Sequence, residues 1–195
     1  MALRVENLTF WQCGPINLSV NKGQCVGIFG ASGSGKTLLL RALADLDPHE
    51  GNVYLNDREC RDVPPHEWRK HIGMIPAEFL WWYDTVGEHF SSIDEQWLAF
   101  LGFSRDVIDW HVNRLSMGER SRLGLLRTLA NHPQALLLDE PTANLDEKNT
   151  RKVEELIKSY QQEHPIPIVW VSHSEEQQRR MSDAAFELLN GMLVP

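Results

Sequence analysis

Residues 30–37 constrain the fold more than any other part of the chain. They read Gly-Ala-Ser-Gly-Ser-Gly-Lys-Thr and match the pattern G-x-x-x-x-G-K-[ST]. The apolar run Gln24–Phe29 before them predicts a buried strand, and Lys36–Leu46 after them has leucines at helical spacing. Glycines in such a strand–loop–helix unit let backbone N–H groups converge on phosphate oxygens at the positive end of the helix dipole.

An ordinary glycine-rich turn is the alternative interpretation of this loop. Average glycine usage gives a chance match in on the order of one chain in a hundred, and the flanking strand and helix make chance rarer still. We therefore predict that Lys36 neutralises the β- and γ-phosphates of a nucleotide and that Thr37 ligates Mg²⁺. The predicted nucleotide contacts of the loop are Gly30, Ser32, Gly33, Ser34, Gly35, Lys36 and Thr37.

Chain length, composition and net charge limit the classes of protein to which the chain can belong. With 195 residues, 42% of them hydrophobic, the chain can form one compact domain with a substantial core. The formal net charge of −8 argues against nonspecific binding of a nucleic-acid backbone. No apolar run approaches the length of a membrane span, and the first residues lack a signal-peptide core, so we expect a soluble, intracellular protein. Cys13, Cys25 and Cys60 show no metal-ligand spacing and are expected to be small core residues.

Strand and helix patterns alternate along most of the chain. Strands are expected at 2–10, 15–20, 51–55 and 72–75, with Pro64-Pro65 marking a loop. The second half predicts helices at 117–131, 147–162 and 174–181, and strands at 135–138, 166–171, 184–189 and 192–194. This alternation predicts a mainly parallel sheet covered by helices on both faces.

The segment from Pro76 to His111 differs from the rest of the chain. It holds four of the seven tryptophans, and its acidic side chains outnumber its single Arg105. Those acids are Glu78, Asp84, Glu88, Asp94, Glu95, Asp106 and Asp109. We predict a mostly helical lobe inserted into the α/β core.

Two carboxylates end a buried strand farther along the chain. Asp139 and Glu140 follow Leu136–Leu138, and Asp139 is placed to hold Mg²⁺ while Glu140 can poise an attacking water as general base. The alternative to a catalytic role is that Asp139 and Glu140 are simply the polar residues at which the strand leaves the core. His173 ends another apolar strand, and parallel strands deliver their carboxyl ends to one edge of the sheet. We therefore expect Lys36, Glu140 and His173 to converge there as the catalytic group.

The segment Leu115–Glu119 can be read in two ways. Ser116 stands at an N-cap position with Glu119 three residues later, which is a capping box and simply starts a helix. The same geometry, with Gly118 in the first turn, can also bind a γ-phosphate.

Together these residues resemble the nucleotide-binding subunit of ATP-binding-cassette (ABC) transporters over nearly the whole chain. Residues 30–37 resemble the Walker A loop, 115–119 the signature motif, 136–140 the Walker B strand, 143–146 the D-loop and His173 the switch histidine. The resemblance implies an α/β P-loop NTPase fold with a mainly parallel sheet, an N-terminal antiparallel β subdomain and a small helical subdomain. It divides the single domain 1–195 into a core (1–75 and 132–195) and a helical subdomain (76–131).

The resemblance also implies a composite active site. In a head-to-tail homodimer, or a dimer with a related cassette, Ser116 and Gly118 of one subunit meet the ATP held on Lys36 of the other, with Asp146 nearby. The aromatic residue that stacks on adenine is expected to be Trp11 rather than Phe10, which continues the alternation of the strand. Two positions depart from the family: Met117 replaces a glycine, and Ala77 stands where a glutamine is expected, so Glu78 is the remaining candidate for that metal contact.

The function implied is an ATPase subunit, with ATP and Mg²⁺, that powers an integral membrane transporter partner without direct contact with nucleic acid. It is expected at the inner face of the cell membrane. The aromatic residues 81–83 stand where such cassettes receive their membrane subunit, and the alternative is that Trp81 and Trp82 pack the core of the helical lobe. The alternatives are a soluble ABC ATPase outside transport and a regulatory cassette with weak turnover. P-loop kinases that act on small molecules are disfavoured as an interpretation, because their mechanism does not require a segment like residues 115–119.

Overall fold

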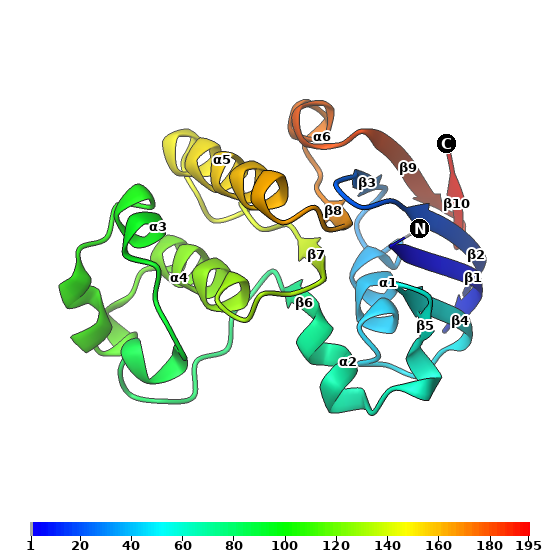
Figure 1. Ribbon diagram of the computed structural model, residues 1–195. Helices are drawn as coiled ribbons and strands as arrows, with labels where there is room; N and C mark the ends of the chain where they lie inside the picture. Colours follow the sequence, from blue (N-terminus) through cyan, green and yellow to red (C-terminus); the bar gives the residue numbers. More distant parts are fainter. Residues whose placement is uncertain (1) are drawn as a thin grey trace.

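The computed structural model describes residues 2–195 (Figure 1). Its N-terminal part is an antiparallel sheet with the strand order β2-β1-β4-β5. The strands are β1 Leu3–Phe10, β2 Cys13–Val20, β4 Glu50–Leu55 and the short β5 Arg58–Glu59. The predicted antiparallel subdomain is confirmed, although the sequence pattern did not indicate β5.

A second sheet of six strands has the order β10-β9-β3-β8-β7-β6. Its neighbours pair in parallel except for the antiparallel pair β10 and β9. The strands are β3 Cys25–Phe29, β6 Ile72–Ile75, β7 Ala135–Asp139, β8 Ile168–Val171, β9 Ala184–Leu189 and β10 Met192–Val194. Every residue of β7 and β8 is buried, as continuous apolar runs predict for central parallel strands.

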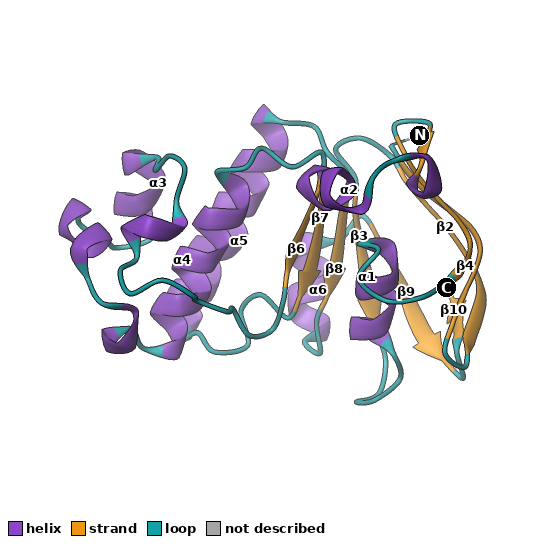
Figure 2. Ribbon diagram, turned by 90° about the horizontal axis from the view of Figure 1, so that it is seen from below, coloured by secondary structure: helices purple, strands orange, loops and turns teal. Residues whose placement is uncertain are grey.

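Helices cover both faces of this sheet, which confirms the predicted α/β class. Helix α1 (Lys36–Leu43) lies between the two sheets, and α4 (Met117–Leu129) and α5 (Glu147–Glu163) lie beyond the opposite face (Figure 2). Helix α6 (Glu175–Met181) packs against β3. The hydrophobic residues that α5 buries recur at helical spacing and form one face: Val153, Leu156, Ile157 and Tyr160.

Two local expectations need correction. Helix α1 ends at Leu43 rather than Leu46, because Asp45 adopts a left-handed backbone with φ of 54° that a helix cannot continue. Pro64-Pro65 marks a loop only at its first residue: Pro64 is the N-cap that precedes α2 (Pro65–His71), whereas Pro65 is the first helical residue, where proline's missing N–H costs nothing.

The segment 76–131 is more irregular than predicted. Besides α4, it contains only one α-helix within the described chain, α3 (Glu95–Phe100), and three 3₁₀ turns at Gly87–His89, Arg105–Asp109 and Val112–Arg114. Its buried residues share one hydrophobic cluster with the sheet, where Leu98 and Leu123 belong to the same cluster as Trp170. The division into a core and a helical subdomain therefore stays a prediction. None of the helices formed by residues 2–195 has the length and apolar character that a membrane crossing requires.

Candidate functional site

The loop between β3 and α1 has the backbone that phosphate binding requires. Gly30, Gly33 and Gly35 all have positive φ, at 144°, 79° and 104°. A Cβ on Gly30 would lie 2.7 Å from the carbonyl oxygen of Leu188, so no larger residue fits there. The glycines of the sequence motif are thus needed to curl the loop.

The Lys36 side chain is buried within this loop. Its Nζ donates hydrogen bonds to the carbonyl oxygens of Gly30, at 2.9 Å, and Ala31, at 2.8 Å. These neutral acceptors hold the ammonium group where the phosphates are expected, and a phosphate oxygen can replace them with a stronger, charge-assisted acceptor.

Thr37 and Asp139 meet at the carboxyl end of β7. Thr37 Oγ1 donates to Asp139 Oδ2 at 2.8 Å, although 102 residues separate the two in sequence. Burial is the main cause of a raised pKa of Asp139; Glu140 adds to it, while the Thr37 hydrogen bond, Lys36 and His173 oppose it. A divalent cation would remove this penalty, and a hydroxyl with a carboxylate is the oxygen set that Mg²⁺ takes.

Glu140 and His173 form the next contact along the same edge. His173 Nε2 lies 2.9 Å from Glu140 Oε1, and both side chains remain partly exposed. The pair meets because β7 and β8 are parallel neighbours, with Asp139 opposite Val171 in register. Glu140 has a positive φ of 49°, so the backbone leaves the extended course of β7 at this residue. The structure therefore brings five predicted site residues to one edge of the parallel sheet, here called the catalytic edge: Lys36, Thr37, Asp139, Glu140 and His173.

The signature segment is on another part of the molecule. Ser116 caps α4 with a complete capping box, and its Oγ is 3.3 Å from the N–H of Glu119. A Cβ on Gly118 would lie 3.2 Å from both the carbonyl oxygen of Asn144 and Cδ2 of Leu145, so Gly118 packs tightly against the loop after Glu140. Helices α4 and α1 cover opposite faces of the sheet (Figure 2), and no hydrogen bond in residues 2–195 joins Ser116 to the phosphate-binding loop.

Residues 13–143 match the model of the family described as ABC transporter. The chain belongs to this family. It is 31% identical to the phosphate import ATP-binding protein PstB of Aeropyrum pernix, over the whole chain and 89% of that protein. It is 33% identical to ABC transporter I family member 17 of Arabidopsis thaliana, over 92% of the chain and 73% of the relative. Among solved structures, the ATP-binding cassette MJ0796, a dimer in a post-hydrolysis state with ADP and Pi, superposes with a TM-score of 0.86 at 25% identity, over 99% of this chain and 97% of that one.

The predicted family, fold class and ATPase activity of this ABC cassette are confirmed by these likenesses. The roles of the individual residues stay predictions, and the geometry supports them unequally. Trp11 is 80% exposed in the β1–β2 turn, whereas Phe10 is buried, so Trp11 is the ring available for stacking on a base. Cys13 Sγ, two residues on, would lie 3.1 Å from a Cβ on Gly35, which places this turn beside the phosphate-binding loop.

Two predicted site residues lie elsewhere in this conformation. Asp146 is the N-cap of α5 and accepts hydrogen bonds from the N–H of Asn149 at 2.8 Å and from its side chain at 2.7 Å. Glu78 lines a cavity of about 320 Å³ together with Met117, Arg120 and Asn144. Within residues 2–195, no hydrogen bond joins Glu78 to Thr37 or Asp139, whose hydroxyl and carboxylate bond each other.

A buried polar network, which no sequence motif indicates, supports the catalytic edge. Gln177 Oε1 accepts from Ser172 Oγ at 2.7 Å, and Gln177 Nε2 donates to Thr142 Oγ1 and Glu154 Oε1, each at 2.9 Å. Arg180 Nη2 closes the network on Glu154 Oε1 at 2.9 Å. Ser172 precedes His173, and Thr142 lies two residues after Glu140, so the network ties both catalytic loops to α5 and α6. The sequence signal for it was weak: one glutamate on the apolar face of α5.

Proposed function

We propose that this cassette hydrolyses ATP at sites shared between two subunits, and that the cycle of closure and opening drives a membrane-embedded partner. The observation that carries the proposal is the separation of the signature segment from the catalytic edge within one chain. Ser116 and Gly118 lie on α4, while Lys36 and Thr37 begin α1 beyond the other face of the sheet. A second copy, placed head-to-tail, can bring them to one nucleotide.

The triphosphate enters the glycine loop, where Lys36 exchanges its two carbonyl acceptors for phosphate oxygens. Thr37 and Asp139 are the residues that would hold Mg²⁺, which neutralises charge on the β- and γ-phosphates. Glu140 accepts the proton of the attacking water, because its partly exposed carboxylate lies just beyond the carboxyl end of β7. His173, 2.9 Å from Glu140, orients that carboxylate and can contact the γ-phosphate.

The partner surface is proposed at a group of exposed hydrophobic residues after β6, two of which are aromatic. Leu80, Trp82 and Tyr83 are 78%, 64% and 51% exposed. Arg127 lies 4.8 Å from the ring centroid of Trp82, and it donates to the carbonyl oxygen of Leu80 at 3.0 Å, so this surface is held in shape. Exposed aromatic rings of this kind anchor protein interfaces. Contact there would place the cassette at the inner face of the membrane.

The enzymatic part of the proposal is tested with Glu140→Gln. The variant keeps the shape of the side chain but cannot accept a proton, so ATP hydrolysis should fall about 10²- to 10⁴-fold while ATP binding persists. Steady-state phosphate release and equilibrium binding of ATP, both with Mg²⁺, measure the two properties. A variant that hydrolyses ATP at the wild-type rate would exclude Glu140 as the base.

A further inference from the structure

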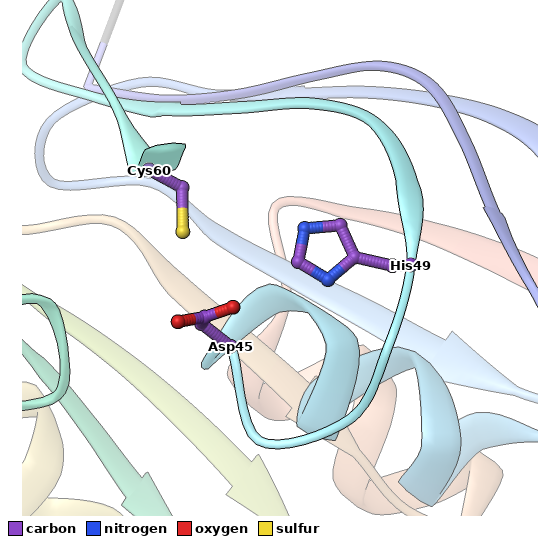
Figure 3. A group of neighbouring side chains, drawn as sticks. All are labelled: Asp45, His49 and Cys60. Atoms are coloured by element: carbon purple, nitrogen blue, oxygen red, sulfur yellow. The ribbon is translucent and has the colours of Figure 1, made fainter. Parts of the chain in front are cut away.

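One group of metal-capable side chains lies outside the ATP site. Within residues 2–195, Asp45, His49 and Cys60 place their ligand atoms within 4.8 Å of one another. Figure 3 shows the three side chains pointing into a common space. They come from two segments: Asp45 and His49 lie in the connection between α1 and β4, and Cys60 begins the 3₁₀ turn Cys60–Asp62 after β5.

The backbone holds Asp45 in place and leaves its carboxylate free. Its N–H donates to Ala42 at 3.1 Å, and its carbonyl oxygen accepts from Arg69 Nη1 at 2.8 Å. Within the described chain, no hydrogen bond or ion pair uses the Asp45 carboxylate. Asp47 contrasts with it, because both of its carboxylate oxygens are taken by Arg41 at 2.7 Å.

His49 is oriented as metal-binding histidines commonly are. Its Nδ1 lies 3.2 Å from the carbonyl oxygen of Asp47. A proton on Nδ1 donated to that oxygen leaves Nε2 with a free lone pair. A backbone carbonyl in this position is a frequent outer partner of a ligating imidazole.

Cys60 is buried, 4% exposed, and its thiol makes no hydrogen bond within residues 2–195. Its Sγ lies within 4.8 Å of a carboxylate oxygen of Asp45. A core cysteine gains nothing from a neighbouring carboxylate. A cation between the two groups would compensate both, because a coordinated thiol is deprotonated outright.

We propose that Asp45, His49 and Cys60 form a binding site for a divalent transition-metal ion of the zinc class. One sulfur, one nitrogen and one oxygen donor form the mixed set that Zn²⁺ and Co²⁺ accept, whereas Mg²⁺ and Ca²⁺ take oxygen donors. Tetrahedral coordination at the usual bond lengths needs ligand separations of about 3.4 to 3.8 Å. Small side-chain rotations reach this from the observed spread, and a water molecule can take the fourth position.

The ion would connect the far end of α1 to the segment that precedes α2. Helix α1 begins at Lys36 and ends two residues before Asp45, so the site braces the helix that carries the phosphate-binding residues. The binding site is separate from the Thr37–Asp139 pair at the other end of that helix. The two sites also differ in donors, because only the proposed one contains a thiol.

Titration with Co²⁺ tests the proposal. Untagged, reduced protein freed of metal by chelation should bind one equivalent of Co²⁺ and develop a thiolate-to-cobalt charge-transfer absorption band in the near ultraviolet. Binding of Co²⁺ at Thr37 and Asp139 gives no such band. Cys60→Ser should abolish the band, and His49→Ala and Asp45→Asn should weaken Co²⁺ binding about 100-fold or more, since loss of even an outer partner costs 10- to 100-fold.

Two variants serve as matched controls, and each should retain the band: Cys25→Ser changes another buried cysteine, and His66→Ala an exposed histidine. Zn²⁺ should raise the midpoint of thermal unfolding of the wild type and not of His49→Ala, a readout that holds even if Cys60→Ser fails to fold. The proposal is overturned if the wild type shows no thiolate band, or if the band and the Zn²⁺ shift survive in both His49→Ala and Asp45→Asn.

Discussion

The buried carboxylate of Glu154 is predicted to hold the catalytic edge together. Its side chain, 6% exposed, accepts hydrogen bonds from Arg180 Nε at 3.2 Å, Arg180 Nη2 at 2.9 Å and Gln177 Nε2 at 2.9 Å. Replacement by alanine removes both carboxylate acceptors from the Arg180 guanidinium, which is 26% exposed, and one acceptor from the buried Gln177 amide, which keeps its bond to Thr142. Breaking one partner of a buried ion pair costs about 3 to 5 kcal/mol. Since Arg180 also pairs with Glu176 at 2.5 Å, we expect the lower half of this range.

Urea unfolding of Glu154→Ala measures this cost. With an m-value of about 2 kcal/mol per molar, the unfolding midpoint should fall by roughly 1.5 M. Glu154→Gln keeps one acceptor and should lose about 1 to 3 kcal/mol. Glu155→Ala, the exposed neighbour on α5, is the control and should stay within about 0.5 kcal/mol of the wild type. A loss below 1 kcal/mol in Glu154→Ala would refute the account of the network.

The same network makes the free energy of unfolding depend on pH. Burial raises the pKa of Glu154, but the hydrogen bonds from Arg180 and Gln177 outweigh it, so the pKa is lowered overall. A lowered pKa in the folded state means that the stabilisation is complete above the ordinary glutamate pKa and is lost as the pH falls through the lowered value. The difference in unfolding free energy between wild type and Glu154→Gln should therefore shrink under acid conditions. A difference that stays constant from neutral to acid pH would contradict the assignment.

Two further predictions concern exposed aromatic side chains. Trp11→Ala should raise the KM for ATP about 5- to 30-fold with little change in kcat, because loss of one base–aromatic stack costs about 1 to 2 kcal/mol; an unchanged KM would remove Trp11 from the site. The double variant Trp82→Ala/Tyr83→Ala should lose co-purification with the membrane subunit while keeping basal ATP hydrolysis, whereas the control Phe100→Ala, another exposed ring, should keep both; retained co-purification would place the partner elsewhere.

The catalytic edge could be predicted from sequence because its logic is local. The motifs are a glycine loop between a strand and a helix, and charged residues at the ends of apolar strands. To predict that they meet, one rule suffices: parallel strands share one carboxyl edge. That rule placed Lys36, Asp139, Glu140 and His173 together, and the structure agrees. Trp11 followed from the alternation of β1, which buries Phe10 and exposes its neighbour.

Other features depended on contacts between distant segments. The bond between Gln177 and Glu154 joins two helices across 23 residues, and no periodicity indicates it. The group Asp45, His49 and Cys60 arises because α1 stops early at a left-handed residue, which the helical leucine spacing did not reveal. The start of α2 at Pro65 differs from the sequence expectation because proline breaks a helix in its interior but is favoured at its first turn.

Mixing two inactive variants tests the central claim, that the active site is completed by a second subunit. Lys36→Ala removes the phosphate-binding ammonium, and Ser116→Arg blocks the exposed start of α4; each alone should hydrolyse almost no ATP. In an equal mixture, a heterodimer has one site with both defects and one intact site, so random two-fold pairing should restore about a quarter of the wild-type activity. No recovery in a mixture shown to form heterodimers, or a wild-type turnover per subunit that is independent of protein concentration down to the monomer, would contradict a shared site.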